Sequence, residues 1–77
     1  MTDDEIKAAL LDLALKRAPD KSFCPSEIAR AMSDDWRPLM PRIRSVAAKM
    51  PEIAATQKGK PVHPLRAVGP IRLRLAK

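Results

Sequence analysis

Aromatic residues are nearly absent from this chain, whose 77 residues include one Phe, one Trp and no Tyr. Proteins that bind single-stranded nucleic acid stack the bases on such side chains, so this scarcity argues against that mode of binding. The hydrophobic core must instead be built from Leu, Ile, Val, Met and Ala. The length allows one small domain, and we expect a single domain over residues 1–77.

Cysteine and histidine are equally rare, and Cys24 and His63 are the only examples. A single cysteine excludes a disulfide within the chain and a metal site built from cysteines. His63 has no cysteine or acid near it in the sequence, so we expect neither a metal site nor a catalytic triad there. The chain also has no glycine-rich phosphate loop, because it contains only two glycines. We therefore expect no metal, no cofactor and no enzymatic activity.

Long apolar runs are missing as well. No stretch approaches the roughly 18 consecutive apolar residues of a transmembrane helix, so we expect no membrane span. The first residues, MTDDEIK, are acidic and do not resemble a secretory signal. Together with the single cysteine, these features favour a cytoplasmic protein.

Acidic residues are almost absent from the second half of the chain. Residues 37–77 hold ten Lys or Arg and one acid, Glu52, whereas residues 1–36 hold five Lys or Arg and eight acids. The net charge of +6 is thus divided into +9 (10 − 1) and −3 (5 − 8). This division favours an anionic partner for the basic half.

The first predicted helix begins near Thr2. Thr2 and Glu5 match a capping box, in which each side chain accepts a hydrogen bond from the other residue's backbone N–H. Apolar residues then recur at helical spacing. Pro19 disfavours the helical conformation at Ala18 and should end the helix there.

The second predicted helix lies in the segment FCPSEIARAM. Pro25 fits its first helical position, where a missing N–H has no consequence. Cys24 is then the N-cap, with a structural role, and Glu27 is the third residue of the helix. Phe23 takes the first position of a hydrophobic staple.

The third predicted helix covers residues 37–50, RPLMPRIRSVAAKM, and begins at about 37 or 38. Pro51 should end it, and Trp36, in the turn before it, is expected to fill the core. One apolar stripe runs along the helix at the spacing i, i+4, i+7, i+8 and i+11. Its members are Leu39, Ile43, Val46, Ala47 and Met50.

The rest of the chain has a different period. Residues 53–57 form a predicted strand, and Gly59 marks a turn. Residues 61–70 include three prolines, which indicates a loop or at most a short edge strand near Val62. Residues 71–76, IRLRLA, alternate apolar and charged side chains, as in a strand with one buried face.

The predicted order is three helices, a strand, a loop and a strand. This order defines an α+β, mainly α, fold with the layout of a winged helix-turn-helix, in which a small antiparallel β-hairpin wing follows the three helices. The second helix, the turn at 33–37 and the third helix form the helix-turn-helix. The wing is then the proline-rich loop.

Four segments support this fold in another way: FCPSEIARAM, WRPLMPRIRSVA, QKGKPV and GPIRLRL. In that order they resemble a family of short bacterial proteins of unknown function with a winged-helix-like fold. The resemblance extends from about residue 5 to residue 76, and His63 stands where the family pattern has an acid. It implies the fold and no activity, because a fold does not confer a function by itself.

The third helix carries the leading candidate site. With its apolar stripe buried, Pro41, Ser45 and Ala48 point outward and basic residues flank them. Ser45 can reach a base edge or a phosphate, and arginines can chelate guanine or pair with phosphate. Lysines of the wing can contact the nucleic-acid backbone. The candidate nucleic-acid-binding residues are Arg37, Arg42, Arg44, Ser45, Lys49, Lys58 and Lys60.

Two functions follow from this surface. The first is a non-enzymatic winged-helix protein that binds duplex DNA through the third helix and the wing. The second is a protein–protein interaction module or accessory subunit whose acidic partner sits on the same basic face. A large exposed apolar patch would favour the second function. A solvated basic face that keeps a small protein soluble is the alternative to both.

Overall fold

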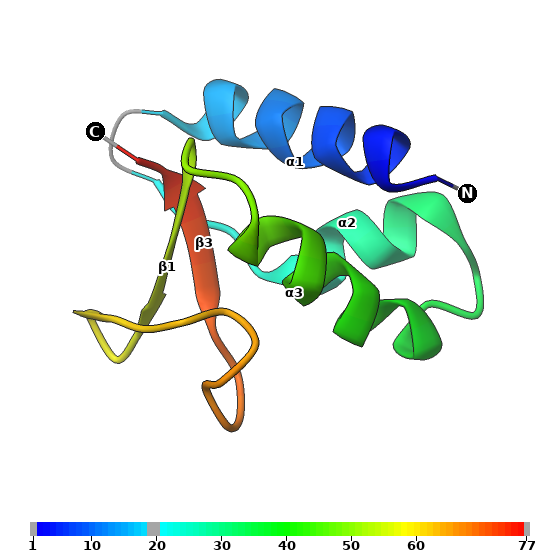
Figure 1. Cartoon of the computed structure of the whole chain (residues 1–77). Coiled ribbons are helices and arrows are strands. Elements are labelled where there is room, and N and C mark those ends of the chain that lie inside the picture. Colours follow the sequence, from blue (N-terminus) through cyan, green and yellow to red (C-terminus); the bar gives the residue numbers. More distant parts are fainter. Residues whose placement is uncertain (1, 19–20, 77) are drawn as a thin grey trace.

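The computed structural model describes residues 2–18 and 21–76 and shows an α+β, mainly α, fold (Figure 1). This confirms the predicted fold class. The described residues form three α-helices, one short 3₁₀ helix and a three-stranded antiparallel sheet. The elements are α1 (Asp3–Arg17), α2 (Pro25–Met32), η1 (Arg37–Leu39), α3 (Met40–Ala48), β1 (Ile53–Gln57), β2 (Lys60–Pro61) and β3 (Arg72–Leu75).

The helices form one side of the molecule and the sheet forms the other. In Figure 1, α1 lies above α2 and α3, and β1 and β3 stand beside the helices. The chain between β2 and β3 extends away from α1, to the lower end of the picture. In the part of the chain that the structure describes, no helix has the length and apolar character needed to cross a membrane.

The start of α1 confirms the predicted capping box. The Thr2 hydroxyl accepts a hydrogen bond from the Glu5 amide at 3.2 Å, and the Thr2 amide donates to the Glu5 carboxylate at 3.1 Å. The helix ends at Arg17, and Ala18 is extended, with ψ of 156°. Ala18 thus has the conformation that a following proline imposes. Pro19 itself lies outside the described residues.

The start of α2 also has the predicted form, with Cys24 as N-cap and Pro25 in the first turn. The Cys24 amide donates to the Glu27 carboxylate at 3.1 Å. Phe23, just before the helix, is fully buried and exchanges two backbone hydrogen bonds of 2.8 and 2.7 Å with Leu73 of β3. This bridge joins the entrance of α2 to the sheet.

Glu27 gives the fold a dependence on acid pH. Burial raises the pKa of Glu27, but hydrogen bonds from Arg17 and from the Cys24 amide outweigh it and lower the pKa below its ordinary value. The Arg17 guanidinium lies 2.8 Å from the carboxylate. A lowered pKa means that the ionised group stabilises the folded chain above the glutamate's unfolded pKa, about 4.3. This stabilisation is lost as the pH falls through the folded value.

Glu27→Gln is therefore expected to lower the free energy of unfolding by about 1 kcal/mol at pH 7, because it removes a charge-assisted hydrogen bond at a half-exposed site. The difference from the native chain should shrink between pH 5 and pH 3. Urea denaturation across this pH range measures it. Glu52→Gln, the same change at an exposed position, is the control and should shift stability by less than about 0.5 kcal/mol throughout. A pH-independent effect of Glu27→Gln would contradict the electrostatic explanation.

The third predicted helix is shorter than expected. A 3₁₀ turn occupies Arg37–Leu39, and the α-helix runs only from Met40 to Ala48. The prediction of one helix over residues 37–50 is thus wrong at both ends. At the start, Pro41 has no N–H to donate to the Arg37 carbonyl, which instead accepts from Met40 in a 3₁₀ bond. At the end, the amides of 49 and 50 make 3₁₀-type bonds three residues back.

The apolar stripe of this segment faces the core as predicted. Its buried members are Ile43, Val46, Ala47 and Met50, and Leu39 is half-buried. They pack on buried residues of α1, such as Leu10, and of the sheet. The orientation of α3 about its own axis is thereby fixed.

The sheet has the order β2-β1-β3, with β1 in the centre and both pairings antiparallel. The strand predicted at 53–57 is confirmed, and the one predicted at 71–76 is shorter by one residue at each end. The short edge strand predicted near Val62 is confirmed: it covers Lys60–Pro61, and the next amide, that of Val62, donates to the Ala55 carbonyl at 3.0 Å. Ile71 and Leu73 are buried and Arg72 is exposed, as the alternation predicts.

The hairpin between β1 and β2 turns through two residues, Lys58 and Gly59, with φ of +54° and +81°. Gln57 and Lys60 pair across it. Two successive positive φ angles suit a tight hairpin turn, and this requirement explains the glycine. The turn places Lys58 and Lys60 at the exposed tip of the hairpin.

Candidate nucleic-acid interface

The outer face of α3 carries small, uncharged side chains at its centre. Successive residues of an α-helix are about 100° apart, so Pro41, Ser45 and Ala48 lie opposite the buried stripe. Pro41 is exposed, and Ser45 and Ala48 are half-buried. No acidic residue occurs between 37 and 51, so this face presents nothing that repels a polyanion.

The flank of α3 that faces α1 carries Arg42 and Lys49, both exposed. The Arg42 Nε lies 3.0 Å from Asp3 Oδ1, with about half of each side chain exposed (46% and 54%). Exposed ion pairs of this kind contribute little to stability and exchange readily with other partners. Arg42 therefore stays available to a phosphate at the loss of one surface contact.

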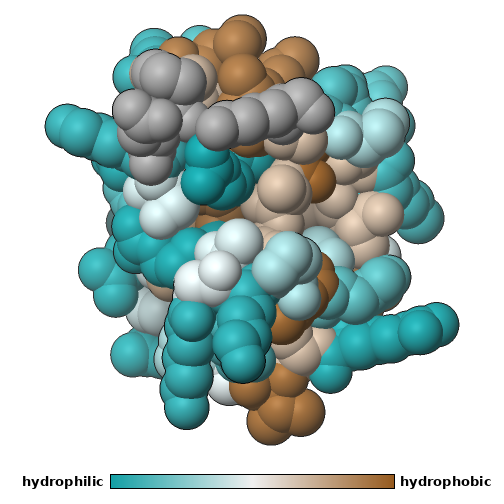
Figure 2. Space-filling view, turned by 90° about the vertical axis from the view of Figure 1, so that its left-hand side faces the viewer, coloured by the Kyte–Doolittle hydropathy of each residue, from teal (hydrophilic) through white to brown (hydrophobic). Residues whose placement is uncertain are grey.

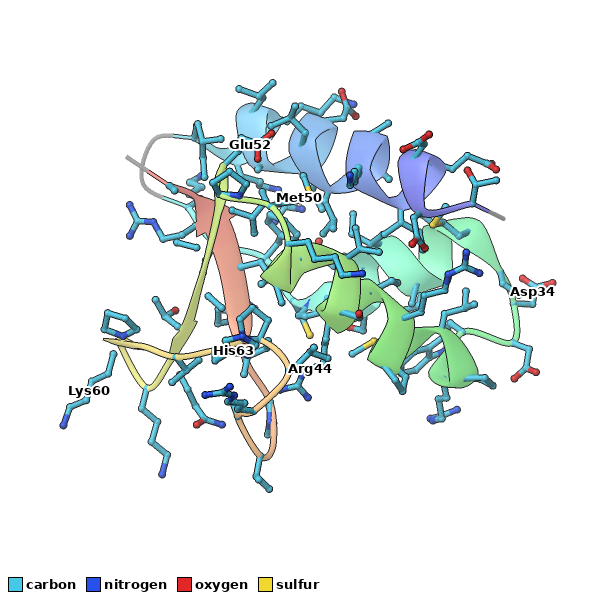
Figure 3. The ribbon with its side chains drawn as sticks, viewed as in Figure 1. Asp34, Arg44, Met50, Glu52, Lys60 and His63 are labelled. Atoms are coloured by element: carbon cyan, nitrogen blue, oxygen red, sulfur yellow. The ribbon has the colours of Figure 1, made fainter. Side chains whose placement is uncertain are left out.

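Arg44 lies on the opposite flank and turns toward the loop between β2 and β3. Its Nε donates to the Pro64 carbonyl at 2.7 Å and its Nη2 donates to the Ala67 carbonyl at 2.8 Å. Figure 3 shows Arg44 between α3 and this loop. The guanidinium is half-buried and holds the loop against the helix. The structure thus gives this predicted contact residue an internal bonding role.

Arg37 stacks on an aromatic ring. Its guanidinium lies 4.6 Å from the centre of the Trp36 ring, and that of Arg30 lies 4.5 Å from it. Trp36 packs against the core but is half-buried, so it is not the enclosed core residue that we expected. Its ring holds two guanidiniums at the surface by cation–π attraction.

The hairpin tip gathers the most accessible cations. Lys58 and Lys60 are exposed and line a cleft of about 590 Å³ with residues of the following loop. Arg66, in that loop, is also exposed. Across the described residues, no salt bridge involves these three side chains or that of Lys49.

Two further side-chain hydrogen bonds hold the same loop and act, like the pair from Arg44, as a brace. Gln57 Nε2 donates to the carbonyls of Val68 at 2.7 Å and Pro70 at 3.1 Å. The sequence gives no signal for this brace or for that of Arg44, because the acceptors are backbone carbonyls, which every residue has. The two braces hold the loop in one shape beside α3.

Two of the acids, Asp34 and Glu52, lie away from the hairpin tip. In Figure 3, Glu52 and Lys60 are at opposite ends of the hairpin strand β1, and Asp34 is in the turn after α2, on the far side of α3. Figure 2, which looks onto the sheet side, shows hydrophilic side chains over much of this face.

The structure divides the predicted site residues into three groups. These are Arg42 and Lys49 beside α1, Arg37 and Arg44 on the opposite flank, and Lys58 and Lys60 at the hairpin, with Ser45 between the first two.

The described residues contain no group of three or more His, Cys, Asp or Glu side chains placed to hold a metal ion. The exposed Lys and Arg groups can pair with phosphates, and the small outer face of α3 allows a close approach.

Fold and surface together define a small α+β domain with a cationic hairpin beside an acid-free helix. The chain belongs to the family described as "protein of unknown function (DUF3253)", whose model matches residues 3–76. No curated protein matches the chain. The resemblance expected from the four sequence segments, to a family without an assigned activity, is thereby confirmed.

Proposed function

We propose that the protein binds duplex nucleic acid, without catalysis, through the cationic end formed by the hairpin and α3. The observation that carries this proposal is the set of exposed cations with no acidic partner among the described residues: Lys49, Lys58, Lys60 and Arg66. Neutralising phosphates with such groups releases counterions, which supplies most of the affinity of non-specific binding.

The topology supports a winged-helix form for this domain. The segment before α2 pairs through Phe23 with β3, and β3 pairs with β1. The hairpin and loop after α3 then project as a wing, beside the outer face of that helix. Ser45 is the polar residue at the centre of this face and is proposed to contact a base edge or phosphate, with Arg42 and Lys49 on the backbone.

The cellular setting belongs to the same proposal. The single cysteine supports a cytoplasmic protein, and the family resemblance supports a bacterial one. In such a setting, duplex DNA is an abundant polyanion, and the affinity for DNA has to be measured as a function of salt concentration.

The proposal predicts binding to random duplex DNA that weakens steeply with salt. A fluorescence anisotropy titration at several ionic strengths measures the slope of log K against log salt. Lys58→Asn with Lys60→Gln removes two charges, and asparagine suits the positive φ at position 58. Losing two phosphate contacts should reduce the slope by about 2 and weaken binding at low salt.

The matched control is Lys7→Gln with Lys16→Gln, which removes two exposed charges from α1. It should leave the slope nearly unchanged, because these lysines lie away from the hairpin. Binding that is undetectable even at low salt would sink the proposal. Equal losses in the two double variants would show that net charge, and not the hairpin surface, governs the affinity.

A further inference from the structure

A pocket of about 350 Å³ lies on the flank of α3 that turns away from α1. Its walls come from three parts of the chain: the start of α2, the segment from Trp36 to Arg44, and residues 69–71. The side chains of Pro25, Met40 and Ile71 make the lining mainly apolar. This volume is at the lower end of the range for ligand sites, about 300–1,000 Å³, and suits one large apolar side chain.

The pocket is formed before any ligand arrives. Pro25 and Ile71 are buried in the core, and Pro25 and Pro70 have restricted backbones. Arg44 fixes the adjoining loop through its two bonds to backbone carbonyls. Little conformational freedom is therefore lost on binding, which favours affinity in a small site.

The charges around the pocket are positive. Arg44 lines it, with two guanidinium nitrogens bonded to loop carbonyls, and the guanidiniums of Arg30 and Arg37 lie over the Trp36 ring that forms one wall. None of the lining residues is acidic. Two acids are next to lining residues along the chain: Glu27, which already binds Arg17 and the Cys24 amide, and the exposed Asp35, which precedes Trp36.

We propose that this pocket binds one apolar side chain carried on an acidic peptide segment of a partner protein. The apolar walls fit the side chain, and the guanidiniums of Arg30 and Arg37 at the Trp36 wall fit the flanking carboxylates. The proposal goes beyond nucleic-acid binding, because the pocket uses Met40 and Arg44 on one flank of α3, whereas Arg42 and Lys49 lie on the other.

A second copy of this chain fits the site less well. The exposed large hydrophobic side chains among the described residues are Leu15, Leu65 and Val68. Leu65 directly precedes Arg66 in the cationic loop and Val68 lies two residues after it, so docking either would bring that guanidinium against the positive charges around the pocket. Leu15 lies beside Lys16, which is already paired with Asp12 at 2.9 Å, so its docking offers the guanidiniums no free carboxylate. Charge complementarity therefore favours an acidic partner.

The test uses fluorescein-labelled nonapeptides whose residues are all Glu or Asp except for one central Leu or Phe. We expect saturable binding to the full chain that is at least about 10-fold tighter than for the same peptide with a central Ala. Replacing the acids with Gln should weaken binding and remove its salt dependence. Equal binding of the Ala peptide would overturn the proposal, because it would show attraction by charge alone.

Cys24 reports the location, because it lines the pocket and is the only cysteine. A bound peptide should slow its reaction with a thiol reagent several-fold, and prior alkylation of Cys24 should block the peptide. Ser26→Phe, which fills the pocket from the first turn of α2, should do the same. Unchanged thiol reactivity in the saturated complex would place the peptide elsewhere and overturn the proposal.

The hairpin variant Lys58→Asn with Lys60→Gln separates this site from the nucleic-acid surface. We expect it to keep the peptide and lose duplex DNA, and Ser26→Phe to do the reverse. If both variants weaken both ligands equally, one polyanion surface explains the data and the pocket proposal falls. Light scattering that shows self-association abolished by Ser26→Phe, without peptide binding, would assign the pocket to a second copy instead. Failure of the DNA titration alone would leave the peptide result intact.

Discussion

Phe23→Ala is expected to lower the free energy of unfolding by about 3–5 kcal/mol, the range for truncating a buried aromatic side chain. Phe23 is fully buried, and it is the largest of the fully buried side chains. A domain of this size has a total stability of only about 4–12 kcal/mol, from about 0.05–0.15 kcal/mol per residue. The substitution therefore removes much of the margin and can unfold the chain outright.

The position of Phe23 makes this effect larger than for a residue inside one element. Its backbone bridges to Leu73 while its ring lies in the core cluster shared by helices and sheet. The cavity left by alanine cannot close without moving the start of α2 or β3. The start of α2 and the strand β3 therefore both depend on one ring.

Urea denaturation followed by far-UV circular dichroism measures the change. With a slope near 1 kcal/mol/M for so small a domain, the midpoint should fall by about 3 M. If Phe23→Ala is unfolded in water, Phe23→Leu should still fold, with a loss of about 1–1.5 kcal/mol. Leu15→Ala, at a side chain that is 58% exposed, is the control and should change stability by less than about 0.5 kcal/mol. A loss below 1 kcal/mol in Phe23→Ala would contradict the bridging role.

Local signals in the sequence predicted the helices of the first half well. The capping box of Thr2 and Glu5, and Pro25 after Cys24, act over three or four residues and need no tertiary contact. The spacing of the stripe that includes Ile43 and Val46 also predicted which side of the third helix is buried. Signals of this range can be read without knowing the fold.

The errors arose where backbone hydrogen bonding decides the outcome. The spacing of apolar residues is similar for a 3₁₀ turn and an α-turn. It therefore did not reveal that a 3₁₀ helix gives way to an α-helix at Met40. The edge strand β2, Lys60–Pro61, was expected near Val62, but it has only two residues and pairing with β1 defines its ends. Neither boundary has a side-chain pattern long enough to detect.

The charges along the sequence indicate which segments are cationic, but they do not show which way each arginine side chain turns. Most of the cations occur in the second half of the chain, and the hairpin lysines are exposed, as the turn at Gly59 implies. The sequence predicts Arg42 and Arg44 as equivalent flanking residues. The structure separates them, because one meets Asp3 at the surface and the other meets carbonyls 20 and 23 residues further along the chain.

This separation leads to a second large expected effect. Arg44→Ala should lower the free energy of unfolding by about 2–3 kcal/mol, because it removes two charge-assisted hydrogen bonds and leaves the carbonyls of Pro64, which is buried, and Ala67 without their donors. Arg42→Ala removes a half-exposed ion pair and should change stability by no more than about 1 kcal/mol. The two variants have the same composition and the same net charge, so they form a matched pair.

Hydrogen exchange distinguishes the two arginines more sharply than stability does. In Arg44→Ala the loop loses its anchor to α3, so the amides of Arg66 and Ala67, which donate to the His63 carbonyl, should exchange much faster than in Arg42→Ala. Arg44→Lys keeps the charge but has no planar fork, and should recover only a small part of the protection. If the amides of Arg44→Lys exchange as slowly as those of the native chain, the positive charge alone is sufficient. The two hydrogen bonds from Arg44 to the loop carbonyls then do not stabilise the loop. If Arg44→Lys exchanges like Arg44→Ala, the geometry of the guanidinium holds the loop between β2 and β3 in place, and a residue that the sequence assigned to ligand contact instead shapes the loop beside the proposed nucleic-acid surface.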